Sequence, residues 1–96
     1  MDWKPADKQR LVRAILALQT EEETANFLRD LLTKNEIGEL ARRLTAAEML
    51  SRKESYAAVE KATGLSSTTV ARVAKWLKGK EGGYRTILAR LRKSPQ

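Results

Sequence analysis

Aliphatic side chains recur at helical spacing along most of this 96-residue chain, and no segment shows the alternation of apolar and polar residues that marks an amphipathic strand. Aromatic residues make up only 5% of the chain, so leucine, alanine, valine and isoleucine must fill the core. Such a core favours packed helices. The sequence therefore predicts an all-α fold, and its length suits one domain or one small domain with an arm that joins a second copy.

Local start and stop signals predict about six helices. Thr33 and Glu36 form a capping box, in which each side chain can bond the backbone N–H of the other residue. The longest helix should follow this box, and Gly64 is expected to end a short helix by taking a positive φ. The full expectation runs from Pro5 to about Leu18, from the Thr20 cap to about Leu32, from Thr33 to Leu50, from the Ser55 cap to Gly64, from a Ser66 or Ser67 cap to a close at Gly79, and from Tyr84 to about Lys93.

The chain contains no cysteine and no histidine. This excludes thiol and imidazole nucleophiles, zinc sites with the usual ligands, disulfides and a histidine pH switch. No glycine loop that could cradle a phosphate and no catalytic dyad is present. We therefore expect a protein that is not an enzyme, with no catalytic residues, no metal site and no cofactor.

The positive charge is confined to one half of the chain. Residues 1–52 are neutral, whereas residues 53–96 hold ten basic and three acidic side chains and so carry the whole net charge of +7. This segregation is typical of a surface that attracts the phosphates of a nucleic acid. No run of 18 apolar residues and no signal series is present, so we expect a cytoplasmic protein with no membrane partner.

The segment 55–77 has the spacing of a helix-turn-helix: a helix of about eight residues, a turn containing Gly64, and a second helix. Val59, Leu65, Val70 and Val73 should form the small core between the two helices. The opposite face of the second helix is then free to meet duplex DNA, because short hydroxyls allow close approach and an arginine can reach guanine or phosphate.

Two segments of the chain resemble a known protein family. The runs LTKNEIGELARRLTAAEML (32–50) and SYAAVEKATGLSSTTVARV (55–73) resemble the Trp repressor superfamily, and most closely its Trp-repressor-like subgroup of the YerC/YecD type. The resemblance implies an intertwined homodimer. It divides the single domain 1–96 into dimerisation helices (1–52), the helix-turn-helix (55–77) and a C-terminal helix (84–93).

The resemblance also implies roles for single residues. Ser67, Thr68 and Ala71 match positions that meet bases, and Lys78 matches a phosphate contact. Ala57 and Glu60 stand where tryptophan-responsive repressors have basic side chains, so those backbone contacts are not expected here. Together with the exposed-face argument, the expected DNA-binding residues are Ser66, Ser67, Thr68, Thr69, Ala71, Arg72, Lys75 and Lys78.

Four positions match the tryptophan pocket of the family. Arg43 and Arg72 correspond to the arginines that flank the indole, although both can instead serve as surface or ion-pairing residues with Glu39 or Glu48. Val73 stands where the pocket needs glycine, and Trp76 replaces a small hydroxyl residue. We expect these two side chains to fill the space, so that DNA is bound without tryptophan.

The sequence thus predicts a DNA-binding transcriptional regulator, a repressor that acts as a homodimer on double-stranded DNA. Two alternatives stay open: an RNA-binding or protein-interaction adaptor, and a tryptophan-responsive repressor. The sequence does not identify any small-molecule effector.

Overall fold

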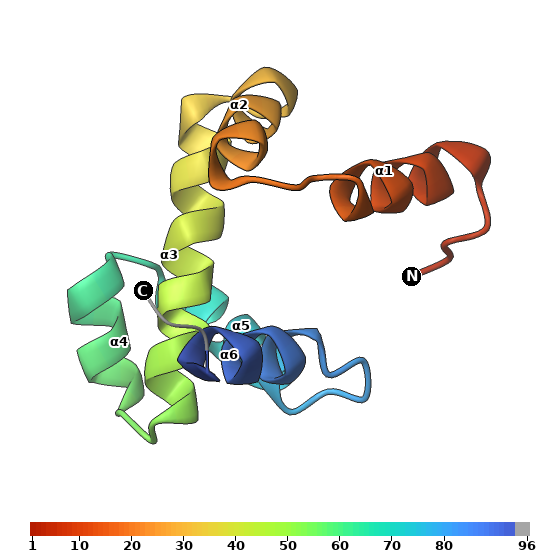
Figure 1. Ribbon diagram of the computed structural model, residues 1–96. Helices are drawn as coiled ribbons and strands as arrows, with labels where there is room; N and C mark the ends of the chain where they lie inside the picture. The colour runs from red at the N-terminus through yellow and green to blue at the C-terminus, as the bar shows by residue number, and fades with distance from the viewer. Residues whose placement is uncertain (94–96) are drawn as a thin grey trace. The chain divides into compact units, whose positions relative to one another are not determined.

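A computed structural model describes residues 1–93 of the chain. Over these residues the protein is all-α, with no strand. Its helices are α1 (Ala6–Leu16), α2 (Glu21–Leu31), α3 (Lys34–Ser51), α4 (Tyr56–Thr63), α5 (Ser67–Leu77) and α6 (Gly83–Lys93) (Figure 1). The all-α prediction is confirmed. The chain divides into two compact units, Met1–Ile37 and Gly38–Gln96, and α3 begins in the first and continues in the second.

The helix starts follow the predicted caps. Thr20 caps α2, since its Oγ1 accepts the N–H of Glu23 at 3.0 Å. The capping box at the start of α3 forms in both directions: Thr33 Oγ1 accepts the N–H of Glu36 at 3.1 Å, and Glu36 Oε1 accepts the N–H of Thr33 at 2.8 Å. These two bonds satisfy donors that a helix start otherwise leaves open.

Three helix limits differ from the sequence prediction. Helix α1 ends at Leu16 rather than near Leu18, because the following residues turn toward the Thr20 cap, where Glu23 Oε1 accepts the N–H of Gln19. Helix α6 begins at Gly83, one residue early. Helix α5 ends at Leu77 with Lys78 as its C-cap, before the predicted close at Gly79, and the glycine with left-handed backbone in this connection is Gly82, with a φ of 68°.

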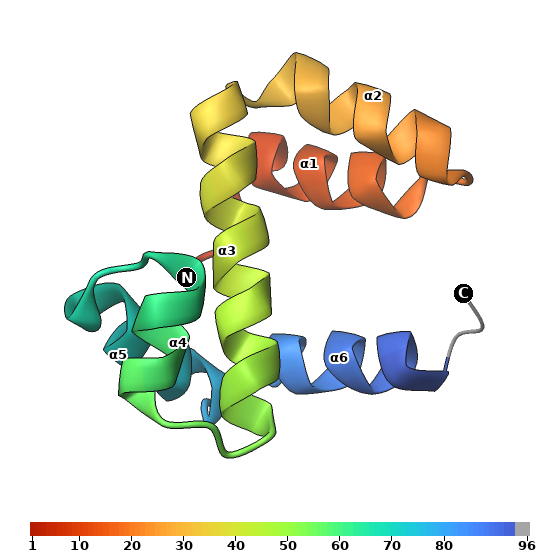
Figure 2. The ribbon, with the colours of Figure 1, turned by 90° about the vertical axis from the view of Figure 1, so that its left-hand side faces the viewer.

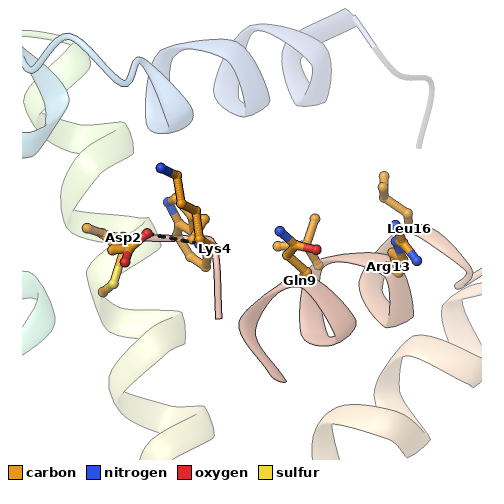
Figure 3. A pocket seen from close by; sticks show the side chains of 8 residues that line it. Asp2, Lys4, Gln9, Arg13 and Leu16 are labelled. Atoms are coloured by element: carbon orange, nitrogen blue, oxygen red, sulfur yellow. Dashed lines mark hydrogen bonds between the residues drawn. The ribbon is translucent and has the colours of Figure 1, made fainter. Parts of the chain in front are cut away.

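The first unit has exposed apolar side chains and no buried residue in either α1 or α2. A shallow groove of about 910 Å³ runs along α1, between that helix and the preceding segment (Figure 3). Its apolar lining includes Trp3, Val12 and Leu16, and Leu16 is 78% exposed. The first unit therefore has an apolar surface that none of its own side chains buries.

The second unit holds the hydrophobic core. Figure 2 shows α4 and α5 on one side of α3, and α6 extending on the other. The core consists of Ala46, Ala47, Met49, Val59, Leu65, Val70, Val73 and Leu88. It includes the four residues predicted for the helix-turn-helix core, of which Val59, Val70 and Val73 are completely buried. Burying one such side chain contributes about 1.5–3 kcal/mol, so this small core fixes the relation of α4 to α5.

Candidate nucleic-acid interface

The α4–turn–α5 segment is a helix-turn-helix built from short-range bonds. Ser55 Oγ accepts the N–H of Ala58 at 3.1 Å and starts α4. Gly64 ends α4 with a φ of 74°, and its N–H donates to the carbonyl of Glu60 at 2.8 Å. Leu65 then enters the core between the two helices. The turn therefore holds α5 against α4 through both backbone geometry and burial.

Four serine and threonine hydroxyls stand at the start of α5, and they are not equivalent. Ser66 is the N-cap: its Oγ accepts the N–H of Thr69 at 3.1 Å and donates to Thr69 Oγ1 at 3.0 Å. Ser67 and Thr68 are exposed, and their hydroxyls form no hydrogen bond with the residues of 1–93. Ser66 and Thr69 are thus engaged in capping, while Ser67 and Thr68 keep their hydrogen-bonding capacity for another molecule.

The other expected DNA-binding residues lie on the outer face of α5. Ala71, Arg72, Lys75 and Lys78 are all exposed, whereas Val70, Val73 and Ala74 of the same helix are buried. The ion pairs of the described residues join Glu39, Glu48 and Glu54 to Arg42, Arg43 and Arg52, so none of them uses a base of α5. Within residues 1–93, Arg72, Lys75 and Lys78 therefore form no ion pair that would compete with their attraction to phosphates.

The four pocket positions also lie in the second unit, but in different surroundings. Val73 is completely buried in the core, whereas Trp76 is 49% exposed, so within a single chain the indole is not enclosed. Arg72 is exposed and takes part in no ion pair of residues 1–93.

Arg43 has the most unusual environment of these four residues. Its Nε lies 3.6 Å from Glu39 Oε1, beyond hydrogen-bond distance, and this buried atom has no hydrogen-bond partner among the described residues. Burial raises the pKa of Tyr84, while the positive charge of Arg43 acts in the opposite direction. Arg43 therefore pairs loosely with Glu39 and influences the Tyr84 hydroxyl electrostatically.

Two side-chain contacts near the interface were not predicted from the sequence. Thr63 is buried and bonds the turn, and a threonine at a helix end is a recognisable signal because its hydroxyl can reach the carbonyl four residues earlier. Arg85 donates a hydrogen bond to the carbonyl of Leu77 across eight residues and a loop. No local pattern indicates that contact.

Comparison with known proteins decides the family. The family model described as Trp repressor protein matches residues 6–92. The chain belongs to the Trp repressor family. It is 38% identical over 85 residues to the uncharacterized protein YerC of Bacillus subtilis, covering 88% of this chain and 82% of that protein. The resemblance seen in the sequence is thereby confirmed.

Two solved structures share the fold of this Trp repressor family member. A TrpR-like protein from Eubacterium eligens aligns with a TM-score of 0.86 and 33% identity, covering 98% of this chain and 97% of that one. A candidate Trp repressor from Staphylococcus aureus aligns with a TM-score of 0.87 and 34% identity, covering 100% and 99%.

The Trp repressor family is a family of regulators rather than of enzymes, and this chain has a helix-turn-helix within the fold that it shares with the two solved structures. Within residues 1–93, no helix has the length and apolar character needed to cross a membrane. The same residues contain no group of three or more acidic side chains placed to hold a metal ion.

Proposed function

We propose that this Trp repressor family member is a sequence-specific transcriptional repressor that binds duplex DNA as a homodimer in the cytoplasm. The start of α5 enters the major groove, where Ser67, Thr68 and Ala71 meet base edges. Arg72, Lys75 and Lys78 supply the attraction to phosphates. The observation that carries this proposal is the exposed, unengaged pair of hydroxyls at Ser67 and Thr68, held on a buried helix-turn-helix core.

The homodimer is supported by apolar surface that the single chain leaves uncovered. Helices α1 and α2 contain no buried residue. The apolar burial within these two helices is therefore too small to offset the conformational entropy that the first unit loses on folding. Exposed apolar residues also lie on α3 and α6. The set comprises Leu11, Val12, Ile15 and Leu16 of α1, Leu40 and Leu44 of α3, and Ile87 and Leu91 of α6. A second copy of the chain covers these faces, and its helix-turn-helix lies roughly 34–36 Å from the first, one turn of the duplex.

The repressor does not need tryptophan as a corepressor. At the position where the tryptophan-responsive members need glycine, this chain has Val73, which is fully buried in the core. Opening a ligand site there would require a valine side chain to leave that core, at a cost of about 1.5–3 kcal/mol. The large indole of Trp76 in place of a small hydroxyl residue further reduces the space.

Selection from a random pool of duplexes tests sequence-specific binding. The parent, Thr68→Ala and Lys78→Ala are each put through the selection. Thr68→Ala should change the preferred sequence, because it removes a side chain at the bases. Lys78→Ala should leave the preferences unchanged and weaken all duplexes alike, because phosphate contacts carry no sequence information. Identical preferences for Thr68→Ala and the parent would contradict the assigned role of Thr68.

Competition between nucleic acids separates this proposal from the adaptor alternative. Duplex DNA, structured RNA and single strands are compared at about 150 mM salt, because phosphate attraction at low salt hides specificity. Preference for a selected duplex supports the repressor. Preference for RNA, or binding of none of the three, supports an RNA-binding or protein-interaction adaptor.

A tryptophan-responsive repressor is the second candidate, and the unpartnered Nε of Arg43 favours it. Calorimetry with L-tryptophan decides between the two. Absence of saturable heat, with unchanged affinity for the selected duplex, supports repression without a corepressor. Saturable heat together with tighter duplex binding supports the tryptophan-responsive alternative.

A further inference from the structure

The connection from α5 to α6 is closed by a charged hydrogen bond. Nη1 of Arg85, in the first turn of α6, donates to the main-chain carbonyl of Leu77 at 2.6 Å. Leu77 is the last residue of α5, and no backbone N–H in residues 1–93 donates to its carbonyl. Hydrogen bonds in which the donor carries a charge are shorter and stronger than those between neutral groups. Arg85 therefore satisfies a carbonyl that the end of the recognition helix would otherwise leave open.

The backbone of the loop between α5 and α6 leaves space for the guanidinium of Arg85. Gly82 has a φ of 68°, which side chains of L residues rarely adopt, and a Cβ at this position would lie 3.1 Å from Nη2 of Arg85. The carbonyl of Gly82 also accepts the N–H of Thr86 at 2.9 Å and so begins α6. Glycine is thus favoured here both by the backbone and by the guanidinium packed against it.

The charge of Arg85 is directed to the helix end rather than to an acidic side chain. Arg85 takes part in none of the ion pairs of the described residues, and α6 contains no acidic residue. A positive charge at a helix C-terminus is stabilising, because the last carbonyls there carry partial negative charge. The next residue after the bonded carbonyl is Lys78, the exposed C-cap of α5.

We infer that Arg85 is a positioning residue for DNA binding: by holding the carbonyl of Leu77 it fixes the C-terminal end of α5 and orients Lys78 toward a phosphate of the duplex. This inference rests on the proposed function. It differs from a direct contact of Arg85 with DNA, because Arg85 acts here only through Lys78.

The dependence of affinity on salt separates the two roles, because its slope counts the phosphates neutralised. Dissociation constants for a duplex recovered from the random pool are measured over a range of salt concentrations. The proteins are the parent, Lys78→Ala, Arg85→Met and the double variant. The proposed homodimer places Lys78 on the duplex twice, so each single variant should reduce the slope by about 1.8, the value of two phosphate contacts. The double variant should show the same loss as either single variant, because the same two contacts are removed in all three.

Arg92→Met is the matched control. It removes the same charge from the exposed surface of the same helix, seven residues further on, and none of the described ion pairs uses Arg92. Its salt slope should equal that of the parent. A loss of about 1.8 in this control as well would mean that α6 itself lies along the phosphates, and would overturn the positioning role.

Hydrogen exchange supplies a readout without DNA. The N–H of Gly79 donates to the carbonyl of Trp76 at 3.0 Å, at the end of α5 that Arg85 holds. Arg85→Met should accelerate exchange of this amide, whereas Arg92→Met should not. Unchanged exchange in Arg85→Met would overturn the inference.

Two further outcomes would also overturn it. A double variant that loses about twice the slope of each single variant indicates that Arg85 contacts its own phosphate. An unchanged slope in Arg85→Met removes Arg85 from DNA binding altogether. If the parent binds no duplex, the proposed function fails, and faster exchange in Arg85→Met then shows that Arg85 orders the loop without any role in DNA binding.

Discussion

In the turn between α4 and α5, Thr63 Oγ1 accepts a hydrogen bond from the backbone N–H of Leu65 at 3.2 Å. The same hydroxyl donates to the carbonyl of Val59 at 2.7 Å. Thr63 is only 8% exposed and Leu65 only 7%. One buried hydroxyl therefore joins the last turn of α4 to the residue that enters the core of the helix-turn-helix.

Replacement of this hydroxyl should destabilise the protein without changing its shape. Thr63→Val keeps the volume but leaves the N–H of Leu65 buried without an acceptor, which costs about 1–3 kcal/mol. Urea denaturation measures the loss, and Thr63→Ser, which retains the hydroxyl, should stay closer to the parent. Equal stability of Thr63→Val and the parent would show that water reaches this amide.

Gly64 and Lys53 share the left-handed backbone conformation, with φ values of 74° and 69°. A Cβ at Gly64 meets no atom within 4 Å, so Gly64→Ala should lose about 1–2 kcal/mol from backbone strain alone. Lys53→Gly, just after α3, should change stability in the opposite direction. It relieves about 1–2 kcal/mol of strain, from which the entropy cost of glycine subtracts about 0.5–1 kcal/mol. Thermal or urea unfolding of both variants checks the pair, and a change of the same sign in both would contradict this explanation.

The capping box predicts a pH dependence. Hydrogen bonds from the backbone and side chain of Thr33 lower the pKa of Glu36 below its ordinary value. The Glu36 carboxylate therefore binds a proton less readily in the folded state than in the unfolded state. Its contribution to the free energy of unfolding is complete above the ordinary carboxyl pKa, and it is lost as the pH falls through the lowered pKa of the folded state. Glu36→Gln, a neutral mimic of the protonated acid, should have a lower Tm than the parent at about pH 7, and the difference should shrink as the pH falls below the ordinary carboxyl pKa.

The control for this experiment is Glu22→Gln, in the first turn of α2, where the Glu22 side chain makes no hydrogen bond or ion pair within residues 1–93. Its Tm should stay close to that of the parent, because this substitution removes no hydrogen bond. A difference between Glu36→Gln and the parent that persists at low pH would show that the carboxylate charge is not its source.

The proposed homodimer predicts a strong effect at Ile15, which is 51% exposed on α1. If a second copy covers this side chain, Ile15→Asp loses the burial of two symmetry-related side chains, worth about 1.5–3 kcal/mol each, or a factor of about 150 to 25,000 in the dimer Kd. Sedimentation equilibrium measures this Kd. Arg10→Asp on the same helix also introduces an acid, but at an exposed polar position, and should leave the dimer intact. Equal dissociation of both variants would argue against burial of Ile15 between copies.

Local signals explain why much of the fold could be predicted. The Thr33–Glu36 box, the Ser55 cap and the Gly64 turn each depend on residues three or four positions apart, and each formed as expected. Hydrophobic spacing likewise identified Val59, Leu65, Val70 and Val73 as core residues. The end of α1 was less predictable, because its apolar spacing continues past Leu16 while the chain turns toward the next cap.

Seven of the eight expected DNA-binding residues are exposed and Thr69 is half-buried, while their role in DNA binding stays a prediction. Side chains of α5 on the face away from Val70 and Val73 are exposed, as their helical spacing requires. The sequence could not distinguish the engaged hydroxyls of Ser66 and Thr69 from the unengaged ones of Ser67 and Thr68. That distinction depends on which rotamers the capping geometry selects.

The sequence by itself determined the helices, their caps, the turn at Gly64 and the half of the chain that carries the positive charge, because these follow from neighbouring residues and from counting. Only the tertiary structure decided that Val73 is buried while Trp76 is half exposed, that Thr63 bonds the turn, and that Arg85 closes the end of α5. The reason is physical: burial and long side-chain hydrogen bonds depend on how helices pack against one another. Local propensity does not contain that information.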